Sequence, residues 1–445
     1  MHTKYTNREI WKVAYPILIS LIMEQLIGMT DTAFMGRVGE VELGASAIAG
    51  VYYLAIFMLG FGFSIGSQIL IARRNGEGNF RMIGPIFYQG IYFLLVMALV
   101  MFTLSRLFSP WILSHVVASP RVCEAAVSYI NWRVFGFFFS FVAIMFRAFF
   151  VGTTQTKTLT LNSIVMVMSN VVFNYILVFG KLGFPALGIA GAAIGSSLAE
   201  LVSMLFFIIY TTRRIDCARY GLNQLVSFRW TELKRIMNVS LWTMIQNAIS
   251  ISTWFLFFIF IEHLGERSLA ITNIVRNVSS IPFMTITAFA STCSSLVSNL
   301  IGSGEARYVM PTIRHRQHVQ LCTCIVWPVI LLIACLPTYV LHIYTDMPDL
   351  VEAAVPTLWV LCSSYLFQCA GFIFFQSVSG TGDTRSAFLL EIVALTCYLI
   401  FIVTVILLLK MDVAVCWFAE HVYAGAIGLL SYLYLKKGSW QRKQI

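Results

Sequence analysis

The chain has 445 residues, of which 59% are apolar and only 11% are charged, and its formal net charge is +10. A soluble globular protein has roughly 45–50% apolar and about 25% charged residues. This composition excludes a soluble enzyme, a disordered chain and a nucleic-acid binder, because the basic residues lie between long apolar blocks rather than in one patch. We therefore expect an all-α polytopic protein whose surroundings are the lipid bilayer.

Apolar runs long enough to cross a bilayer recur along the whole chain. A span needs about 20 predominantly apolar residues. Dividing the sequence at its polar breaks predicts twelve spans, at 12–36, 45–72, 84–108, 126–151, 158–180, 187–211, 237–263, 268–299, 317–340, 353–379, 386–409 and 412–435. Because this number is even, both termini are expected on the same side of the membrane.

The distribution of Lys and Arg predicts which side that is. The segments on the side of the termini carry 21 basic residues, and those on the opposite side carry six. Since basic loops stay in the cytoplasm, this bias predicts a multi-pass protein of the cytoplasmic (inner) membrane with both termini in the cytoplasm.

Four strings of the first half recur in order in the second half. GRVGEVELGASAI resembles EHLGERSLAITNI, and ARRNGEGN resembles SNLIGSGEA, both at an offset of 226 positions. SPRVCEAAV resembles MPDLVEAAV, and VGTTQTK resembles SGTGDTR, both at an offset of 228. With six spans in each half, both halves enter the membrane the same way round. We predict an N-terminal lobe at 1–211, a cytoplasmic linker at 212–236 and a C-terminal lobe at 237–445.

A parallel repeat of two six-span lobes, related by a pseudo-twofold axis, is typical of a transporter whose lobes rock about a central site. A channel is more often built from identical subunits, and an enzyme needs a catalytic cluster. The sequence contains no HExxH, no GxSxG and no paired Cys/His set. We therefore predict no catalytic residue, and a membrane-embedded enzyme is the alternative from a different class.

The first span carries two acids and a proline. Glu24 and Asp31 are seven positions apart and share one helix face, and ionisable groups in a bilayer usually face a cavity or each other. Pro16 lies 15 positions before Asp31 and permits a bend. We predict an acidic, hinged helix. The alternative is that Asp31 caps the end of the span at the membrane surface.

Spans 5 and 6 add polar groups that can serve the same site. Asn170 and Asn174 lie one helical turn apart, where their amides can accept from a protonated carboxyl or ligate a cation. The alternative is hydrogen bonding between helices. Ser196 and Glu200, also one turn apart, are the polar remainder of a helix rich in small residues.

Other polar residues are isolated within spans. Gln68, Gln246 and Gln368 suit a wet cavity, with packing as the alternative. Glu391 and Glu420 are expected to pair locally or to lie near an interface.

These features resemble those of the multidrug and toxic compound extrusion (MATE) family. The resemblance rests on the repeat, the twelve spans and several strings, and it covers essentially the whole chain. The strings are YPILISLIMEQLIGMTDTAFMGRVG, GSQILIARRNGEGN, FRAFFVGTTQTKT, SNVVFNYILVFGKLGFPALGIAGAA and SGTGDTR. The resemblance implies a fold of two six-helix bundles forming a V, and export of organic cations and other amphipaths in exchange for H+ or Na+.

The resemblance also implies roles for particular residues. Asp31 matches the family's first-span acid and Pro16 its bending proline. The family's N-lobe cation site adds polar residues of spans 5 and 6, which match Asn170, Asn174 and Ser196. No firm metal site is expected, although Na+ is a candidate at Asp31.

Two positions depart from the family pattern. Asn174 stands where prokaryotic members often have an acid, and this lowers the negative charge of the site. Ser250 stands where many members have a span-7 glutamate, which puts a C-lobe ion site in doubt. Glu24 is the repeat equivalent of Ser250 and is a candidate substrate or secondary proton site, as are the three glutamines and Glu200.

The resulting hypothesis is a secondary active multidrug exporter that antiports amphipathic organic cations or other drugs against H+, or less favourably Na+, by alternating access. It requires no cofactor beyond the coupling ion, is not an enzyme and acts as a monomer. The alternative is a lipid-linked precursor flippase. Such a protein would need an arginine-rich cavity, for which this chain offers only Arg133, Arg147 and Arg276.

Overall fold

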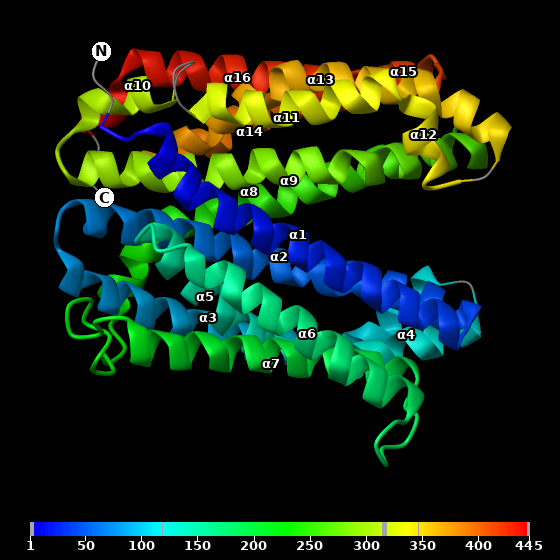
Figure 1. Cartoon of the computed structure of the whole chain (residues 1–445), viewed down its shortest axis with the longest axis horizontal. Helices are drawn as coiled ribbons and strands as arrows, with labels where there is room; N and C mark the ends of the chain where they lie inside the picture. The colour runs from blue at the N-terminus through cyan, green and yellow to red at the C-terminus, as the bar shows by residue number, and fades with distance from the viewer. Residues whose placement is uncertain (1–3, 118, 314–317, 346, 443–445) are drawn as a thin grey trace. The chain divides into compact units, whose positions relative to one another are not determined.

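The computed structural model describes residues 4–117, 119–313, 318–345 and 347–442. In these residues the regular structure is helical, with no strand (Figure 1). The α-helices are α1 (Asn7–Val38), α2 (Glu40–Gly76), α3 (Ile83–Val116), α4 (Pro120–Arg133), α5 (Gly136–Gly152), α6 (Lys157–Phe179), α7 (Ile189–Arg214), α8 (Trp230–Glu262), α9 (Glu266–Gly302), α10 (Val309–Ile313), α11 (His318–Cys335), α12 (Pro337–His342), α13 (Pro348–Gly380), α14 (Thr384–Ile402), α15 (Val413–Cys416) and α16 (Ala419–Lys437). Short 3₁₀ turns are η1 (Phe80–Met82), η2 (Ala306–Tyr308) and η4 (Ser439–Arg442), and η3 (Val403–Leu408) is a π-helical continuation of α14.

Local chemistry explains several helix ends. Before α1, the Thr6 amide donates to Glu9 at 2.7 Å and the Glu9 amide donates to the Thr6 hydroxyl at 3.3 Å, which is a reciprocal capping box. Helices α4 and α13 begin with Pro120 and Pro348, in the first turn, where a missing amide costs no intrahelical hydrogen bond.

Within the described ranges, eleven helical segments are long and apolar enough to cross a membrane. The pair α4 and α5, bent by 53° at the break between Arg133 and Gly136, brings the number to twelve. This confirms the predicted fold class, an all-α protein with twelve spans. The predicted boundaries are less accurate, because 126–151 holds this bend and Pro337 starts a new helix inside 317–340.

The chain folds as two compact units. One unit spans Ile19–Ile245, and the other comprises the described residues up to Leu18 and from Gln246 onward. Both divisions fall inside helices, α1 and α8, and they lie 227 positions apart, one more than the repeat offset of 226. The predicted lobes, 1–211 and 237–445, follow the sequence repeat, and their boundaries stay a prediction.

Packing explains why the start of α1 belongs to the unit that contains α9 and α13, and why the start of α8 belongs to the unit Ile19–Ile245. Ile10 and Ala14 are fully buried in the hydrophobic core of the unit that contains α9 and α13. Trp11 of the same segment stacks on Phe289 of α9, with ring centroids 6.1 Å apart. In the other unit, Thr243 of α8 donates to the Gly62 carbonyl of α2 at 2.7 Å. Each segment is therefore held by contacts within its own unit.

The connection between α7 and α8 packs on α3, within the unit Ile19–Ile245. Tyr88 and Tyr92 of α3 donate at 2.7 Å to the carbonyls of Leu222 and Val226. Gln89 donates to the Ser227 carbonyl at 2.8 Å. Residues 215–229 are thus tied to α3 along their length, and they are shorter than the predicted linker at 212–236 because α7 and α8 extend into both of its ends.

Candidate functional site

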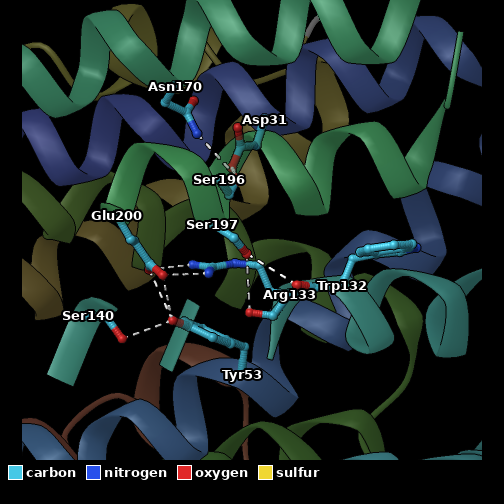
Figure 2. A network of polar contacts seen from close by, with 9 residues as sticks. All are labelled: Asp31, Tyr53, Trp132, Arg133, Ser140, Asn170, Ser196, Ser197 and Glu200. Carbon is cyan, nitrogen blue, oxygen red and sulfur yellow. Dashed lines mark hydrogen bonds and ion pairs between the residues drawn. The ribbon is translucent and has the colours of Figure 1, made fainter. Parts of the chain in front are cut away.

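Asp31 lies in a hydrogen-bonded cluster with two asparagines and a serine. Asn174 of α6 donates to one Asp31 carboxylate oxygen at 2.5 Å, and Ser196 of α7 donates to the other at 3.3 Å. Asn170 donates to the Ser196 hydroxyl at 3.2 Å (Figure 2). The structure thus brings together all four residues predicted for ion coupling, from three helices. Their role in transport stays a prediction.

Tight packing between α6 and α7 places these side chains. Asn170 and Asn174 are fully buried, and they face α7 because its first turns carry small residues. A side chain at Gly195 would put its Cβ 2.1 Å from the Asn174 amide oxygen, so a larger residue there would displace the Asn174 side chain. That amide oxygen accepts no hydrogen bond within the described residues.

A second network lies beside the first. Arg133, the last residue of α4, donates two hydrogen bonds of 2.8 and 2.7 Å to the two Glu200 carboxylate oxygens. The Tyr53 hydroxyl lies 3.0 Å from each of the same oxygens and 3.1 Å from the Ser140 hydroxyl (Figure 2). The guanidinium stacks over the Tyr53 ring at 3.6 Å, a cation–π contact. Glu200 is therefore fully engaged.

The α4–α5 bend makes room for this network. A Cβ on Gly136 would come within 2.2 Å of a Glu200 oxygen and 2.3 Å of an Arg133 nitrogen. The absence of a side chain at Gly136 thus leaves space for the Arg133–Glu200 ion pair. The sequence pattern predicts neither a role for Tyr53 nor the pairing of Arg133 with Glu200. The available signal was an arginine just before a Phe-Gly step inside a predicted span.

Helix α7 connects the two networks. Ser196 and Glu200 are one turn apart on its surface, the first bonded to Asp31 and the second to Arg133. Ser197 donates to the carbonyls of Trp132 and Arg133 at 3.3 and 3.4 Å (Figure 2). A shift of α7 would therefore change the hydrogen bonds of both Asp31 and Glu200.

Glu24 lines a cavity of about 210 Å³ in the same unit. Its side chain is 52% exposed and forms a single 3.4 Å ion pair with Arg147, whose side chain is 13% exposed. Ser20 is within hydrogen-bond distance of Ser163, at 2.8 Å, on the cavity wall. Glu200 also reaches the wall, but Asp31 is not among the lining residues.

The remaining sequence candidates lie apart from this cavity. Gln68 and Gln246 are buried, and neither lines the cavity. Gln368 donates to Ser364 at 2.9 Å and lies 3.5 Å from a Glu420 oxygen. Helix α1 continues without interruption through Pro16, so the proposed bend at this residue stays a prediction.

The other unit has an acidic site of its own. Ser250 of α8 donates a short hydrogen bond to Glu391 of α14, and Tyr423 of α16 donates to the same oxygen at 3.1 Å. The other Glu391 oxygen has no partner in the described part of the chain. The sequence pattern indicates only the loss of an acid at Ser250, and it does not predict the contact with Glu391.

A family model described as MatE matches residues 16–176 and 243–406, which together make up most of the chain. The chain belongs to the MatE family. The two matched segments start 227 positions apart, in agreement with the internal repeat.

Two relatives of this MatE protein match it over most of their length. It is 21% identical over 445 residues to a probable multidrug resistance protein NorM of Thermotoga maritima, covering 99% of this chain and 94% of the relative. It is 24% identical over 396 residues to a protein of the same name in Shewanella oneidensis, covering 87% and 84%.

Solved structures share its fold. One is the outward-facing conformation of a multidrug resistance MATE family transporter of the MOP superfamily, with a TM-score of 0.87, 16% identity, and coverage of 98% of this chain and 97% of that one. A MOP superfamily transporter from Pyrococcus furiosus matches with a TM-score of 0.85, 16% identity and the same coverage. At this identity the likeness establishes the all-helical fold of this MatE protein alone.

Proposed function

We propose that this MatE protein is a secondary active multidrug exporter, which antiports amphipathic organic cations or other drugs against H+ by alternating access. It acts as a monomer in the cytoplasmic (inner) membrane, with both termini in the cytoplasm. The names of the relatives support this class of activity. The observation that supports ion-coupled transport is the Asp31 cluster, in which one carboxylate accepts hydrogen bonds from Asn174 and Ser196.

The donors around Asp31 favour H+ over Na+ as the coupling ion. A sodium ion requires several oxygen ligands that point toward it. Here Asn174 and Ser196 turn an N–H and an O–H toward the carboxylate, and the one acid supplies a single negative charge. Proton binding needs no such set of ligands. It turns a carboxylate that only accepts hydrogen bonds into a carboxyl group that also donates one.

Protonation gives the site two states. The deprotonated Asp31 accepts from α6 and α7 and holds α1 against them. A proton on one oxygen removes an acceptor position and loosens one of these contacts. Pro16, which supplies no backbone N–H, lets α1 bend in response. The bend changes the wall that α1 contributes to the cavity, and the bound drug is displaced outward.

The flippase alternative has less support. A pyrophosphate group requires several free cationic side chains. Arg133 is paired with Glu200 through two hydrogen bonds. Arg276 belongs to the other unit, where its guanidinium lies 5.7 Å from the Trp254 ring centroid. Arg147 is left as the basic residue on the cavity wall in the described part of the chain.

Efflux of a fluorescent organic cation, ethidium, from proteoliposomes tests the proposal. A pH gradient and a Na+ gradient are imposed separately on vesicles with wild type or Asp31→Asn. We expect the pH gradient to drive efflux by wild type and the variant to lose gradient-driven efflux.

A matched carboxyl-to-amide change is the control. Asp216→Asn alters an exposed acid between α7 and α8 and should transport as wild type does. Normal pH-driven efflux by Asp31→Asn would overturn the assignment of Asp31. Absence of ethidium efflux under both gradients would overturn the proposal that organic cations are exported.

A further inference from the structure

The charged groups at the cavity differ in how strongly they are paired. Glu200 accepts two hydrogen bonds from Arg133 and a third from Tyr53, so its negative charge is already paired. Glu24 and Arg147 have only their single 3.4 Å contact with each other as an ion pair, and Glu24 is half exposed. The cavity therefore presents one accessible carboxylate and one accessible guanidinium, of opposite sign and side by side.

Arg147 is largely buried, whereas Glu24 is half exposed and accepts one further weak hydrogen bond, from Ser20 at 3.4 Å. The Arg147 side chain is 13% exposed, and its guanidinium lies 5.7 Å from the Phe61 ring centroid. Within the described residues, Glu24 is its one hydrogen-bonded acceptor. Most of the five donors of the guanidinium are thus open to a planar, two-oxygen acceptor such as a carboxylate.

Exchange of partners decides which ligands this pair accepts. A ligand with a single positive charge competes with Arg147 for Glu24. A ligand with a single negative charge competes with Glu24 for Arg147 in the same way. The penalty for a lost partner is largest at Arg147, because its side chain is 13% exposed and its charge would stay desolvated. A ligand carrying both charges keeps both protein groups paired.

The rest of the wall is mainly apolar and aromatic, with a few polar side chains (Ser20, Ser140, Asn162, Ser163, Ser203 and Glu200). Tyr53, Phe57 and Phe207 line the cavity together with Met166 and several aliphatic residues. At about 210 Å³ the cavity is smaller than the several hundred Å³ that drug-sized ligands usually occupy. Its size and lining suit one compact aromatic body.

We propose that the Glu24–Arg147 pair determines specificity, and that the cavity selects small aromatic zwitterions, with the ligand's ammonium on Glu24 and its carboxylate on Arg147. This deepens the proposed export function and rests on it. The purely cationic drugs named above are then the weaker class of ligand.

Three indole compounds of nearly equal shape test this selection. Tryptophan carries both charges, tryptamine only the ammonium and indole-3-propionate only the carboxylate. Isothermal titration of the purified full-length protein in lipid nanodiscs gives a Kd for each. We expect tryptophan to bind at least about tenfold more tightly than either singly charged analogue, the effect of one lost charge pair.

Two variants assign the two charges separately. Arg147→Met should remove the advantage of tryptophan over tryptamine, and Glu24→Gln its advantage over indole-3-propionate. Arg147→Lys should retain a preference for the zwitterion, and Arg276→Met, which removes a basic residue outside this cavity, should leave all three Kd values unchanged. Loss of wild-type preference in Arg276→Met would contradict the assignment.

The outcomes separate this inference from the exporter proposal. Equal or tighter binding of tryptamine, or no binding of tryptophan, overturns the zwitterion inference, while ethidium efflux under a pH gradient still supports export. Selective binding of tryptophan with no gradient-driven efflux of tryptophan or ethidium supports the binding site and overturns the exporter proposal.

Discussion

Arg133 at the end of α4 and Glu200 on α7 are joined by two parallel hydrogen bonds of 2.8 and 2.7 Å. Their side chains are 12% and 7% exposed, so the pair is shielded from water. Planar bidentate geometry is the arrangement in which an arginine and a carboxylate compensate best for their lost hydration. The pair fastens α4 to α7 directly beside the Asp31 cluster.

Removing one member of this pair should destabilise the protein strongly. We expect Arg133→Met or Glu200→Gln to lower the free energy of unfolding by about 3–5 kcal/mol, because each leaves a buried charge or donor set without its partner. The double variant Arg133→Met/Glu200→Met should lose much less than the sum of the single changes. Thermal unfolding in detergent, analysed as a double-mutant cycle, measures the coupling, and additive losses would contradict it.

Adding a second acid to the Asp31 cluster should change the coupling ion. Asn174→Asp places a carboxylate where the amide now lies 2.5 Å from Asp31. Two negative charges favour a bound cation, so we expect the ratio of Na+-driven to pH-driven efflux to rise by about tenfold. Asn162→Asp on the same helix is the control, because Asn162 bonds Ser203 rather than Asp31. An unchanged ratio in Asn174→Asp would show that this position does not contribute to ion selection.

Pro16→Ala should slow transport without abolishing ligand binding. Alanine restores a backbone N–H to α1 and stabilises the straight helix, by up to about 3 kcal/mol in an exposed helix interior. We expect efflux to slow several-fold while the Kd for the transported cation stays unchanged. Pro110→Ala, at another proline inside a helix, serves as the comparison. Equal slowing by both variants would argue against a special role of Pro16.

Glu391 should tolerate an amide far better than Glu200 does. Its hydrogen bonds from Ser250 and Tyr423 are all of the kind that a glutamine oxygen can also accept, and no ion pair to it is found among the described residues. We expect Glu391→Gln to change the free energy of unfolding by less than about 1 kcal/mol, against the larger loss in Glu200→Gln. Comparable losses in the two variants, measured by thermal unfolding, would contradict this difference.

Docking of the amino-terminal residues should depend on pH. The hydrogen bond from Lys4 holds the pKa of Glu305 below its ordinary value. Because the folded-state pKa is lowered, the contact contributes stability above the unfolded pKa and loses it as pH falls through the folded value. A spin label on an unnatural amino acid at Arg8, which is exposed, should gain mobility between about pH 5 and pH 3. In Glu305→Gln the label should be more mobile at pH 7 and respond less to pH.

Much of the fold followed from local signals. The twelve spans and the repeat are visible because apolar runs and repeated strings need no knowledge of contacts. Pro120 and Pro348 mark helix starts by the same local chemistry. The grouping of Asp31 with Asn174 and Ser196 was also predicted, although from resemblance rather than from the residues alone.

The partner choices did not follow from these signals. Nothing in the sequence indicates that Arg133 meets Glu200, 67 positions away, or that Ser250 meets Glu391, 141 positions away. Each pairing depends on the rotation of two helices about their own axes and on the depth at which they cross.

The amino-acid sequence by itself determined the number of spans, the parallel repeat and the acid on which the proposed coupling depends, because hydropathy and helical spacing are properties of neighbouring residues. Only the tertiary structure decided that Glu200 is paired with Arg133 while Glu24 and Arg147 share one weaker contact, and that α1 and α8 each divide between the two compact units. These features arise from close contacts between distant segments, and side-chain packing selects such contacts.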